Sequence, residues 1–320
     1  MNTSAPGQIL VRPATPADLP RVIAAADAVF RSPPVEGLHS MGHDYPLLFS
    51  SDNASHLLIA EDGAGELLAH AGFVLRAASL DGTEVPVATI GSVFTRPDQR
   101  QRGLATQVLA AAVESARRAG ALLGMVSGHR GLYERAGFAP YPACPRYWVP
   151  AAPADAEAAD LAIEPYTDDA LNDVMALSAR EPVHFVRSVA DWKRLLGAKV
   201  LFFEPAEVFL IRRAGRVVAY LALGRPNRST PDARDPVVRS ARVLELAGDR
   251  AAIAVAVPVI AHRLGVTLLE VLLPPSDGSL ADQAAARGWQ TELAQLPFTA
   301  AWWDPTLARL PLPFYGFNYV

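Results

Sequence analysis

Three arginines and one glycine stand close together in the stretch RPDQRQRGLA, residues 96–105, of a 320-residue chain with a formal net charge of -4. The free N–H groups of a first helical turn attract anions, and a glycine there lets a ligand approach the backbone closely. Arg100 and Arg102 can add charge-assisted hydrogen bonds. With Gly103 and the small Ala105 beside them, the stretch predicts a site for a polyanion such as a phosphate group.

A strand and a helix flank this stretch. The β-branched run VATIGSVFT, residues 87–95, is typical of a strand. The alanine-rich run at residues 104–120 predicts a helix that Gly120 ends. The stretch is therefore a strand-to-helix turn, although its arginines are also compatible with a merely solvated face. The sequence has neither a G-x-x-x-x-G-K-[ST] phosphate loop nor a G-x-G-x-x-G dinucleotide turn.

With its flanking elements, the turn resembles motif A of the GNAT superfamily of acyl-CoA-dependent N-acetyltransferases, [RQ]-x-x-G-x-[GA]. Arg100, Gly103 and Ala105 match the pattern. The resemblance implies that the turn holds the pyrophosphate of acetyl-CoA, while the preceding strand pairs with the pantetheine arm through its backbone. No metal is expected. The implied acetyl-CoA-binding residues are Val93, Phe94, Thr95, Arg100, Gln101, Arg102, Gly103, Leu104, Ala105 and Thr106.

The run LLGMVSGHRGLYERAGFAPY, residues 122–141, resembles motif B of the same superfamily, and the whole resemblance covers about residues 8–148. It implies that Tyr133 is the general acid for the departing CoA thiolate, and that a backbone N–H near Phe94 or Thr95 stabilises the oxyanion. Tyr133 is alternatively a packing residue on an amphipathic helix. His129 is a candidate general base, and its alternative is a cap or surface residue.

The long segment at residues 30–56 occupies the place where this family varies its acceptor-binding loop. Glu36, His39, His43 and Asp44 cluster within it and are candidates for contact with a small-molecule amine. An ordinary surface loop is the alternative. The two histidines stand four residues apart, but no helix is evident and Pro and Gly interrupt the region, so the sequence does not predict a metal site there.

The two halves of the chain repeat one pattern of strands, helices and turns. Five landmark residues recur in order at offsets of 145 to 152 positions. These landmarks predict two copies of one α/β unit with a boundary in the Pro/Ala-rich stretch at residues 150–160. The pairs are Pro13 with Pro165, Thr15 with Thr167, Gly65 with Gly215, Gly120 with Gly265, and Gly137 with Gly288.

The expected fold class is α/β (α+β), with two GNAT-like units that each contain a mixed, mostly antiparallel twisted sheet flanked by helices. The expected domains are residues 1–150, a catalytic GNAT domain, and 160–320, a degenerate copy. In the second copy Asp249 stands between Gly248 and Arg250, where a pyrophosphate would sit, and the tyrosine position of motif B is alanine-rich. We therefore expect only the first unit to bind acetyl-CoA.

The C-terminal run LPLPFYGFNYV, residues 310–320, is aromatic, proline-rich and uncharged. A strand or clasp packed on the second unit is the simpler interpretation. The layout also resembles the enhanced intracellular survival acetyltransferases, which implies that the Val320 carboxylate reaches the active site. The third domain of those proteins has no counterpart here.

Composition narrows the class of protein further. The net charge argues against a general nucleic-acid binder, and the longest apolar span, residues 251–261, is too short for a membrane helix. One cysteine and the lack of a signal peptide predict a cytoplasmic protein.

The sequence thus predicts an acetyl-CoA-dependent N-acetyltransferase acting on a small amine. Its alternatives are a non-catalytic acetyl-CoA sensor or scaffold, and an aminoacyl or fatty-acyl transferase. Oligomeric state is not predicted.

Overall fold

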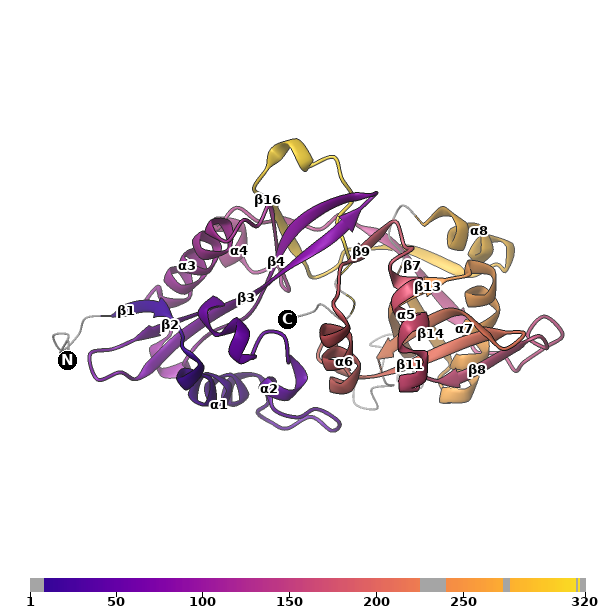
Figure 1. Ribbon diagram of the computed structural model, residues 1–320, viewed down its shortest axis with the longest axis horizontal. Coiled ribbons are helices and arrows are strands. Elements are labelled where there is room, and N and C mark those ends of the chain that lie inside the picture. The colour runs from indigo at the N-terminus through magenta and orange to yellow at the C-terminus, as the bar shows by residue number, and fades with distance from the viewer. Residues whose placement is uncertain (1–8, 225–239, 273–276, 315, 317–320) are drawn as a thin grey trace.

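The computed structural model describes residues 9–224, 240–272, 277–314 and 316. These residues form two mixed sheets of eight strands each, flanked by helices (Figure 1). The expected fold class, two GNAT-like units of α/β type, is confirmed. Each sheet contains one parallel pair of neighbours, β4 with β5 in the first and β13 with β14 in the second, and its other pairs are antiparallel.

The first sheet has the strand order β1-β2-β3-β4-β5-β16-β6, and β9 pairs with β3 at its side. Its strands are β1 (Leu10–Pro13), β2 (Leu57–Glu61), β3 (Leu67–Leu80), β4 (Thr83–Thr95), β5 (Leu123–Val126), β6 (Ala139–Pro140), β9 (Val183–Phe185) and β16 (Thr299–Trp302).

The second sheet has the order β10-β11-β12-β13-β14-β7-β15, and β8 pairs with β11. Its strands are β7 (Cys144–Pro150), β8 (Leu161–Pro165), β10 (Val200–Leu201), β11 (Glu204–Arg213), β12 (Arg216–Gly224), β13 (Ser240–Gly248), β14 (Leu268–Leu272) and β15 (Gln290–Ala294).

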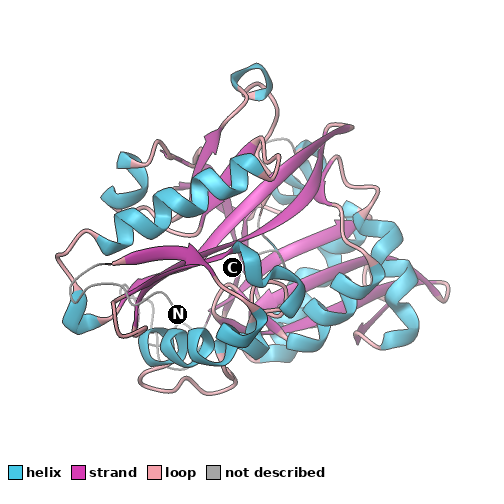
Figure 2. Ribbon diagram, turned by 60° about the vertical axis from the view of Figure 1, so that its left-hand side comes forward, coloured by secondary structure: helices cyan, strands magenta, loops and turns pink. Residues whose placement is uncertain are grey.

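Helices cover the sheets. In the first unit α3 and α4 lie on one side of the sheet and α1 and α2 on the other (Figures 1 and 2). The α-helices are α1 (Leu19–Phe30), α2 (Met41–Asp44), α3 (Leu104–Arg118), α4 (Gly131–Arg135), α5 (Leu171–Ser178), α6 (Val189–Ala198), α7 (Arg250–Leu264) and α8 (Gly278–Ala286). Short 3-10 helices span Pro16–Asp18, Ser51–His56, Pro97–Gln99, Asp168–Ala170 and Pro305–Leu307.

The repeated pattern in the sequence corresponds to repeated elements. β1, a 3-10 turn and α1 in the first half correspond to β8, a 3-10 turn and α5 in the second. The hairpin β2–β3 corresponds to β11–β12, and α3–β5 corresponds to α7–β14. The glycine turns adopt the positive φ angles that favour glycine, 81° at Gly65 and 77° at Gly215.

Sheet membership does not follow the order of the halves along the chain. β7 lies before residue 150 but belongs to the second sheet, where it pairs with β14 and β15. β16 lies near the end of the chain but belongs to the first sheet, between β5 and β6. Figure 1 shows the yellow β16 among the magenta strands of the first unit. The pairing of strands into sheets therefore does not follow the expected boundaries at residues 150 and 160.

Apolar side chains form three clusters. One lies between α3 and the first sheet, where Leu104, Val108 and Leu109 are fully buried or nearly so. A second lies around α7, a helix in which more than half of the residues are buried. The third joins α1 and α2 of the first unit to α5 and α6 of the second. The two units therefore share a continuous apolar core.

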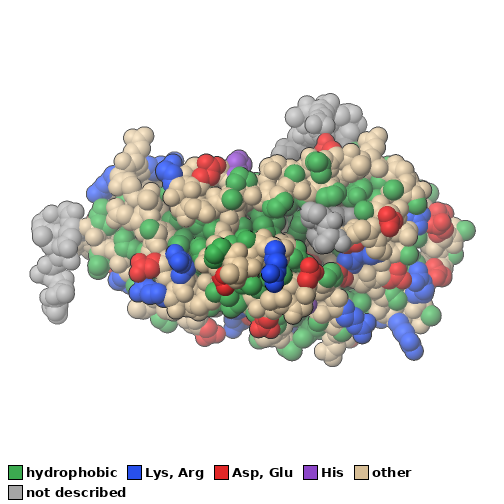
Figure 3. All heavy atoms as spheres, turned by 90° about the horizontal axis from the view of Figure 1, so that it is seen from above, with side chains coloured by type: hydrophobic (Ala, Val, Ile, Leu, Met, Phe, Trp, Pro, Cys, Tyr) green, Lys and Arg blue, Asp and Glu red, His purple; other side chains and the backbone are tan. Residues whose placement is uncertain are grey.

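The surface carries charges of both signs. On the face drawn in Figure 3, basic and acidic side chains are scattered among apolar ones. None of the helices in the described part of the chain is long and apolar enough to cross a membrane.

Candidate active site

The first sheet opens between its two parallel strands. β5 pairs with β4 from Val87 to Ile90 and ends at Val126, whereas β4 continues to Thr95. No described strand pairs with the edge of residues 91–95 that faces β5. Val93, Phe94 and Thr95 lie along this stretch of β4, and an extended ligand can pair with those backbone groups that face the open edge as a further strand would.

A β-bulge shapes β4 at this opening. The pairing advances two residues on β3, from His70 to Gly72, but three on β4, from Phe94 to Gly91. The extra residue bends the strand, and Ser92 adopts a φ of 51°. Its carbonyl accepts a hydrogen bond from His70 Nδ1 at 2.7 Å. The His70 side chain is completely buried, so this hydrogen bond holds β4 in place at the point where β4 separates from β5.

His70 itself is a neutral donor in this arrangement. Burial lowers its pKa from 6.5 to about 4, and the bond to Ser92 only partly opposes that shift. Since Nδ1 donates, Nε2 is left as an acceptor. Nε2 is buried and has no hydrogen-bond partner among the residues that the structure describes, and the same holds for the Ser92 and Thr95 hydroxyls. Sequence reasoning missed this histidine, because its partner is 22 positions away and no local pattern relates the two residues.

The predicted anion site is a turn that begins a helix. Gly103 is the N-cap of α3, with a φ of 74° and no side-chain cap. A Cβ atom built on Gly103 meets nothing within 4 Å, so the space beside it is open. The first intrahelical bond runs from Gln107 N to the Gly103 carbonyl. The N–H groups of Leu104, Ala105 and Thr106 therefore precede the helical ladder and are available to an anion.

The arginines of the turn differ in their partners. Arg96 is paired with Asp98 at 2.6 Å, which neutralises its charge locally. Arg102 donates to the Gln99 amide oxygen, which carries no charge. Arg100 has no hydrogen-bond or ion-pair partner in the described parts of the chain. The positive charges of Arg100 and Arg102 beside Gly103 are thus not balanced by a described acidic partner, whereas that of Arg96 is balanced by Asp98. Gln101 has a φ of 65° and completes the turn.

Tyr133 lies on α4, directly after the loop that follows β5. Its ring packs on Gly128, where an added Cβ would lie 2.8 Å from the ring. Burial raises the pKa of the phenol, and the nearby Arg130 partly opposes the shift. The hydroxyl has no hydrogen-bond partner in the parts of the chain that the structure describes. It is therefore protonated at neutral pH and available to a ligand. His129, in the loop between β5 and α4, is exposed.

A strand from the far end of the chain supports this loop. Thr299 of β16 donates its hydroxyl to the Gly128 carbonyl at 3.1 Å. The threonine is fully buried, and its strand also pairs with β5 through Val126. The C-terminal part of the chain therefore helps to position the loop between β5 and α4. Sequence spacing cannot indicate a contact between residues 171 positions apart.

The segment expected to contact the acceptor is divided. His39, His43 and Asp44 come together at α2, whereas Glu36 is exposed in a turn outside that cluster. The expectation that this region contains no helix is wrong: residues Met41–Asp44 form α2, and the Ser40 side chain caps it by accepting from His43 N. The local signal is weak, since the helix has four residues and includes a glycine.

The second unit lies against this segment. A Cβ on Gly37 would be 2.7 Å from the Pro205 side chain of β11. Phe203 stacks on Phe30 of α1, with ring centroids 6.3 Å apart. The two units therefore meet beside the α1–α2 loop.

In the corresponding turn of the second unit, the side chain of Asp249 lies at the N-terminus of the helix. Asp249 caps α7 by accepting from Ala251 N and Ala252 N at 2.9 and 3.0 Å. The next residue, Arg250, is paired with Glu181 and with Asp277. A carboxylate thus occupies the place that Gly103 leaves open in the first unit, which disfavours a second anion there.

The C-terminal segment reaches the second unit. Phe314 and Gly316 line a cavity beside Leu244 of β13 and Leu272 of β14. Tyr141 donates its hydroxyl to the Pro313 carbonyl. Val320, the proposed carboxylate, lies outside the described residues.

The chain is similar to known acetyltransferases in its first half. Residues 10–141 match the family model of the acetyltransferase (GNAT) domain. No curated protein matches the sequence.

Solved structures share the whole fold. A GCN5-related N-acetyltransferase from Kribbella flavida has a TM-score of 0.62 at 16% identity, covering 92% of this chain and 70% of that one. A conserved protein of unknown function from Enterococcus faecalis, described as a probable N-acyltransferase, has a TM-score of 0.67 at 11% identity, covering 94% and 74%. Eis1 from Mycobacterium abscessus has a TM-score of 0.59 at 16% identity, covering 93% and 74%.

The two-unit fold of this chain is therefore the fold of these solved structures. The family match is more specific, because it covers both motifs in order. Residues 10–141 are thus a GNAT acetyltransferase domain by this match.

Proposed function

We propose that the protein transfers an acetyl group from acetyl-CoA to a primary amine of a small molecule, in the first unit. The observation that carries the proposal is the open edge of residues 91–95 beside an uncapped helix N-terminus at Gly103. These two features fit the two parts of the donor. The open edge suits the amide groups of the pantetheine arm, and the turn suits its pyrophosphate.

The charge of the turn supports the same donor. Arg100 and Arg102 are exposed beside Gly103 and can neutralise phosphate oxygens. Acetyl-CoA supplies a thioester, whose carbonyl carbon accepts an amine directly. The bulge in β4 turns the backbone near Phe94, so that an N–H there can stabilise the negative charge that develops on the carbonyl oxygen.

Tyr133 is the proposed general acid. Its hydroxyl keeps its proton at neutral pH and has no described protein partner, so it can donate to the departing thiolate. His129 is the proposed base, since it is exposed at the loop before α4. Glu36, His39, His43 and Asp44 are proposed to lie along the path of the amine, with the second unit as a wall.

The second unit is proposed to bind no acetyl-CoA. Asp249 supports this view, because a pyrophosphate at α7 would face its carboxylate and would compete with it for the same N–H groups. The proposed domains are a catalytic unit on residues 1–150, whose sheet also includes β9 and β16 from the later chain, and a supporting unit on residues 160–320, whose sheet also includes β7.

Calorimetric titration with acetyl-CoA tests the donor and the number of sites. We expect one site per chain with micromolar affinity. Gly103→Glu should abolish binding, because it places a carboxylate at the turn. Gly120→Glu is the matched control, since Gly120 also has a positive φ and open space but lies at the other end of α3. Two sites per chain would contradict the assignment of the second unit, and no binding would remove the proposed donor.

A Tyr133→Phe variant separates an enzyme from an acetyl-CoA sensor. After an acceptor is found by screening amines for CoA release, the variant should lower kcat by about 100-fold or more, with little change in acetyl-CoA affinity. Equal kcat in the two proteins would exclude Tyr133 as the acid. Binding without CoA release for any amine would favour the sensor.

A further inference from the structure

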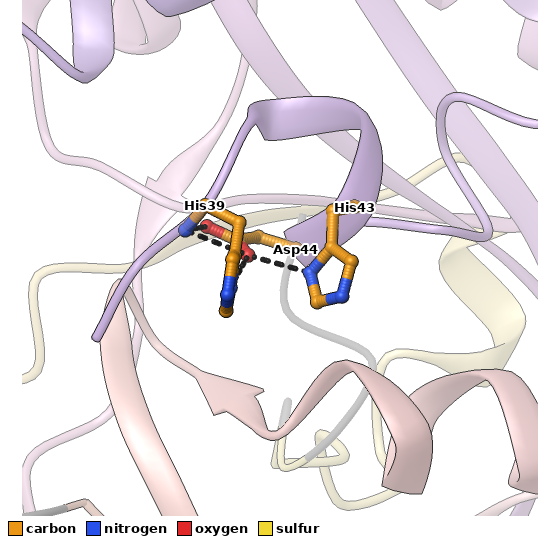
Figure 4. Close-up of side chains that lie close together, drawn as sticks. All are labelled: His39, His43 and Asp44. Carbon is orange, nitrogen blue, oxygen red and sulfur yellow. Dashed lines mark hydrogen bonds and ion pairs between the residues drawn. The ribbon is translucent and has the colours of Figure 1, made fainter.

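Two histidines and one aspartate converge at the start of α2. His39 immediately precedes the cap residue of the helix, and His43 and Asp44 lie within it (Figure 4). The Asp44 side chain is completely buried, while the side chains of His39 and His43 are 62% and 48% exposed. The cluster therefore has one fixed carboxylate at its base and two imidazoles that solvent reaches.

The distances match the coordination of a metal ion. Asp44 Oδ1 lies 3.1 Å from His43 Nδ1 and 3.6 Å from His39 Nδ1. One ligand atom from each of the three residues falls within 4.8 Å of the others. A tetrahedral Zn²⁺ with bonds of about 2.0–2.2 Å has ligand atoms roughly 3.3–3.5 Å apart. The three ligand atoms are thus close enough together for one ion to contact all of them.

Hydrogen bonds leave one of the two imidazoles unexplained. His43 Nδ1 can donate to Asp44 Oδ1, but at 3.6 Å the ring of His39 is too far for such a bond. Nevertheless the two rings lie side by side, with centroids 4.3 Å apart and both Nδ1 atoms near the same oxygen. A shared cation between them accounts for the convergence.

Hydrogen bonds to its other oxygen, Oδ2, hold the Asp44 carboxylate in place. Asp44 Oδ2 accepts from Arg31 Nη2 at 2.8 Å and from His39 N at 3.0 Å. The side chain of Arg31 is itself nearly buried and lies against the rings of Tyr45 and Phe203. Partners of this kind orient a ligand before the metal arrives. Because Arg31 also neutralises part of the carboxylate charge, we expect moderate rather than very tight affinity.

We propose that His39, His43 and Asp44 bind a divalent transition-metal ion, with Zn²⁺ as the best match. Two imidazoles and one carboxylate are borderline ligands that suit Zn²⁺, Co²⁺ or Ni²⁺ better than Mg²⁺ or Ca²⁺. The fourth position faces solvent and is open to water or to another ligand. The ion would fix the residues before α2 to the helix, at the place where the second unit meets the first. The same three residues are proposed above to lie along the path of the amine, so a bound ion would lie beside that path. Metal binding itself can be measured whether or not the proposed acetyl transfer takes place.

Metal titration of the full chain, free of any histidine tag and first treated with EDTA, tests the site. We expect one Zn²⁺ per chain with micromolar affinity, and Co²⁺ should give the visible absorption of a tetrahedral site. His39→Ala and His43→Ala should each weaken binding at least tenfold. Both side chains are exposed, so these variants should fold. His262→Ala is the control, because His262 is an exposed histidine near the end of α7.

The double variant His39→Ala/His43→Ala decides the outcome. Zn²⁺ should raise the Tm of the wild type and of His262→Ala but not that of the double variant. If the double variant binds Zn²⁺ as tightly as the wild type, or if His262→Ala loses the binding, the proposed site is overturned.

Discussion

His70 makes the stability of the protein depend on pH. When the pH falls from 7.5 to 5.0, we expect this one side chain to lower the free energy of unfolding by about 2 kcal/mol. His70 is completely buried between the rings of Phe49 and Phe94, and its Nδ1 donates to the Ser92 carbonyl. Protonation of Nε2 would place a charge in this apolar environment without a partner.

The magnitude follows from the pKa of His70. Burial lowers the pKa from 6.5 in the unfolded chain to about 4 in the folded protein. Between these values the unfolded chain binds a proton that the folded protein does not bind. The stability is therefore complete above pH 6.5, falls as the pH decreases, and stops falling below pH 4. Each pH unit in this window is worth about 1.4 kcal/mol, and pH 5.0 lies 1.5 units below 6.5.

Urea unfolding at pH 7.5 and pH 5.0, followed by tryptophan fluorescence, measures the effect. The window lies above the range in which Asp18 titrates, because its ion pair with Arg12 lowers the pKa of that carboxyl. In His70→Phe, which suits the apolar surroundings, the loss of stability between the two pH values should be about 2 kcal/mol smaller than in the wild type. His70→Asn, which retains a donor for Ser92, should behave in the same way.

His56→Gln is the control for the pH experiment. His56 is half-buried, and burial also lowers its pKa. The loss of stability between the two pH values should therefore be closer to that of the wild type in His56→Gln than in the His70 variants. If the wild type and both His70 variants lose the same free energy between pH 7.5 and pH 5.0, His70 is not a buried neutral group and the reasoning fails.

Two further predictions concern the second unit. Gly248→Ala should lower the free energy of unfolding by about 3 kcal/mol, because Gly248 has a φ of 106° and an added Cβ would lie 2.3 Å from the Val218 carbonyl. Gly265→Ala should lower the free energy of unfolding by only about 1 kcal/mol, since Gly265 has a φ of 66° but open space around an added Cβ. If urea unfolding shows equal losses for the two variants, the steric argument for Gly248 is refuted. Asp249→Ala should cost about 1 kcal/mol through the lost cap of α7, and a loss below the error of the same measurement would contradict the capping role.

Local sequence predicted the parts of the site that are local. The turn at residues 96–105 and the helix after it were predictable, because Gly103 and the alanine-rich run determine them within a few residues. The paired glycine turns were predictable for the same reason. Arg96 was not distinguished from Arg100 by its type or spacing, since only the folded side chains show that Asp98 neutralises it.

The supporting contacts were not predictable. His70 and Thr299 act on Ser92 and Gly128, and these pairs depend on sheet register and on a strand from the other end of the chain. The short helix α2 also gave little signal, because four residues that include a glycine show no periodicity. Local patterns therefore specify the turn at residues 96–105, while long-range packing specifies the supporting contacts of Ser92 and Gly128.

The exchange of β7 and β16 has a consequence for synthesis of the chain. Thr299 pairs with Val126, so β5 lacks a neighbour on that side until residues 299–302 have left the ribosome. All four residues of β5 are buried in the finished protein, and a bare apolar edge of this kind attracts other chains. β7, made earlier, must likewise wait for β14. The first half therefore cannot complete its sheet before the second half has been made.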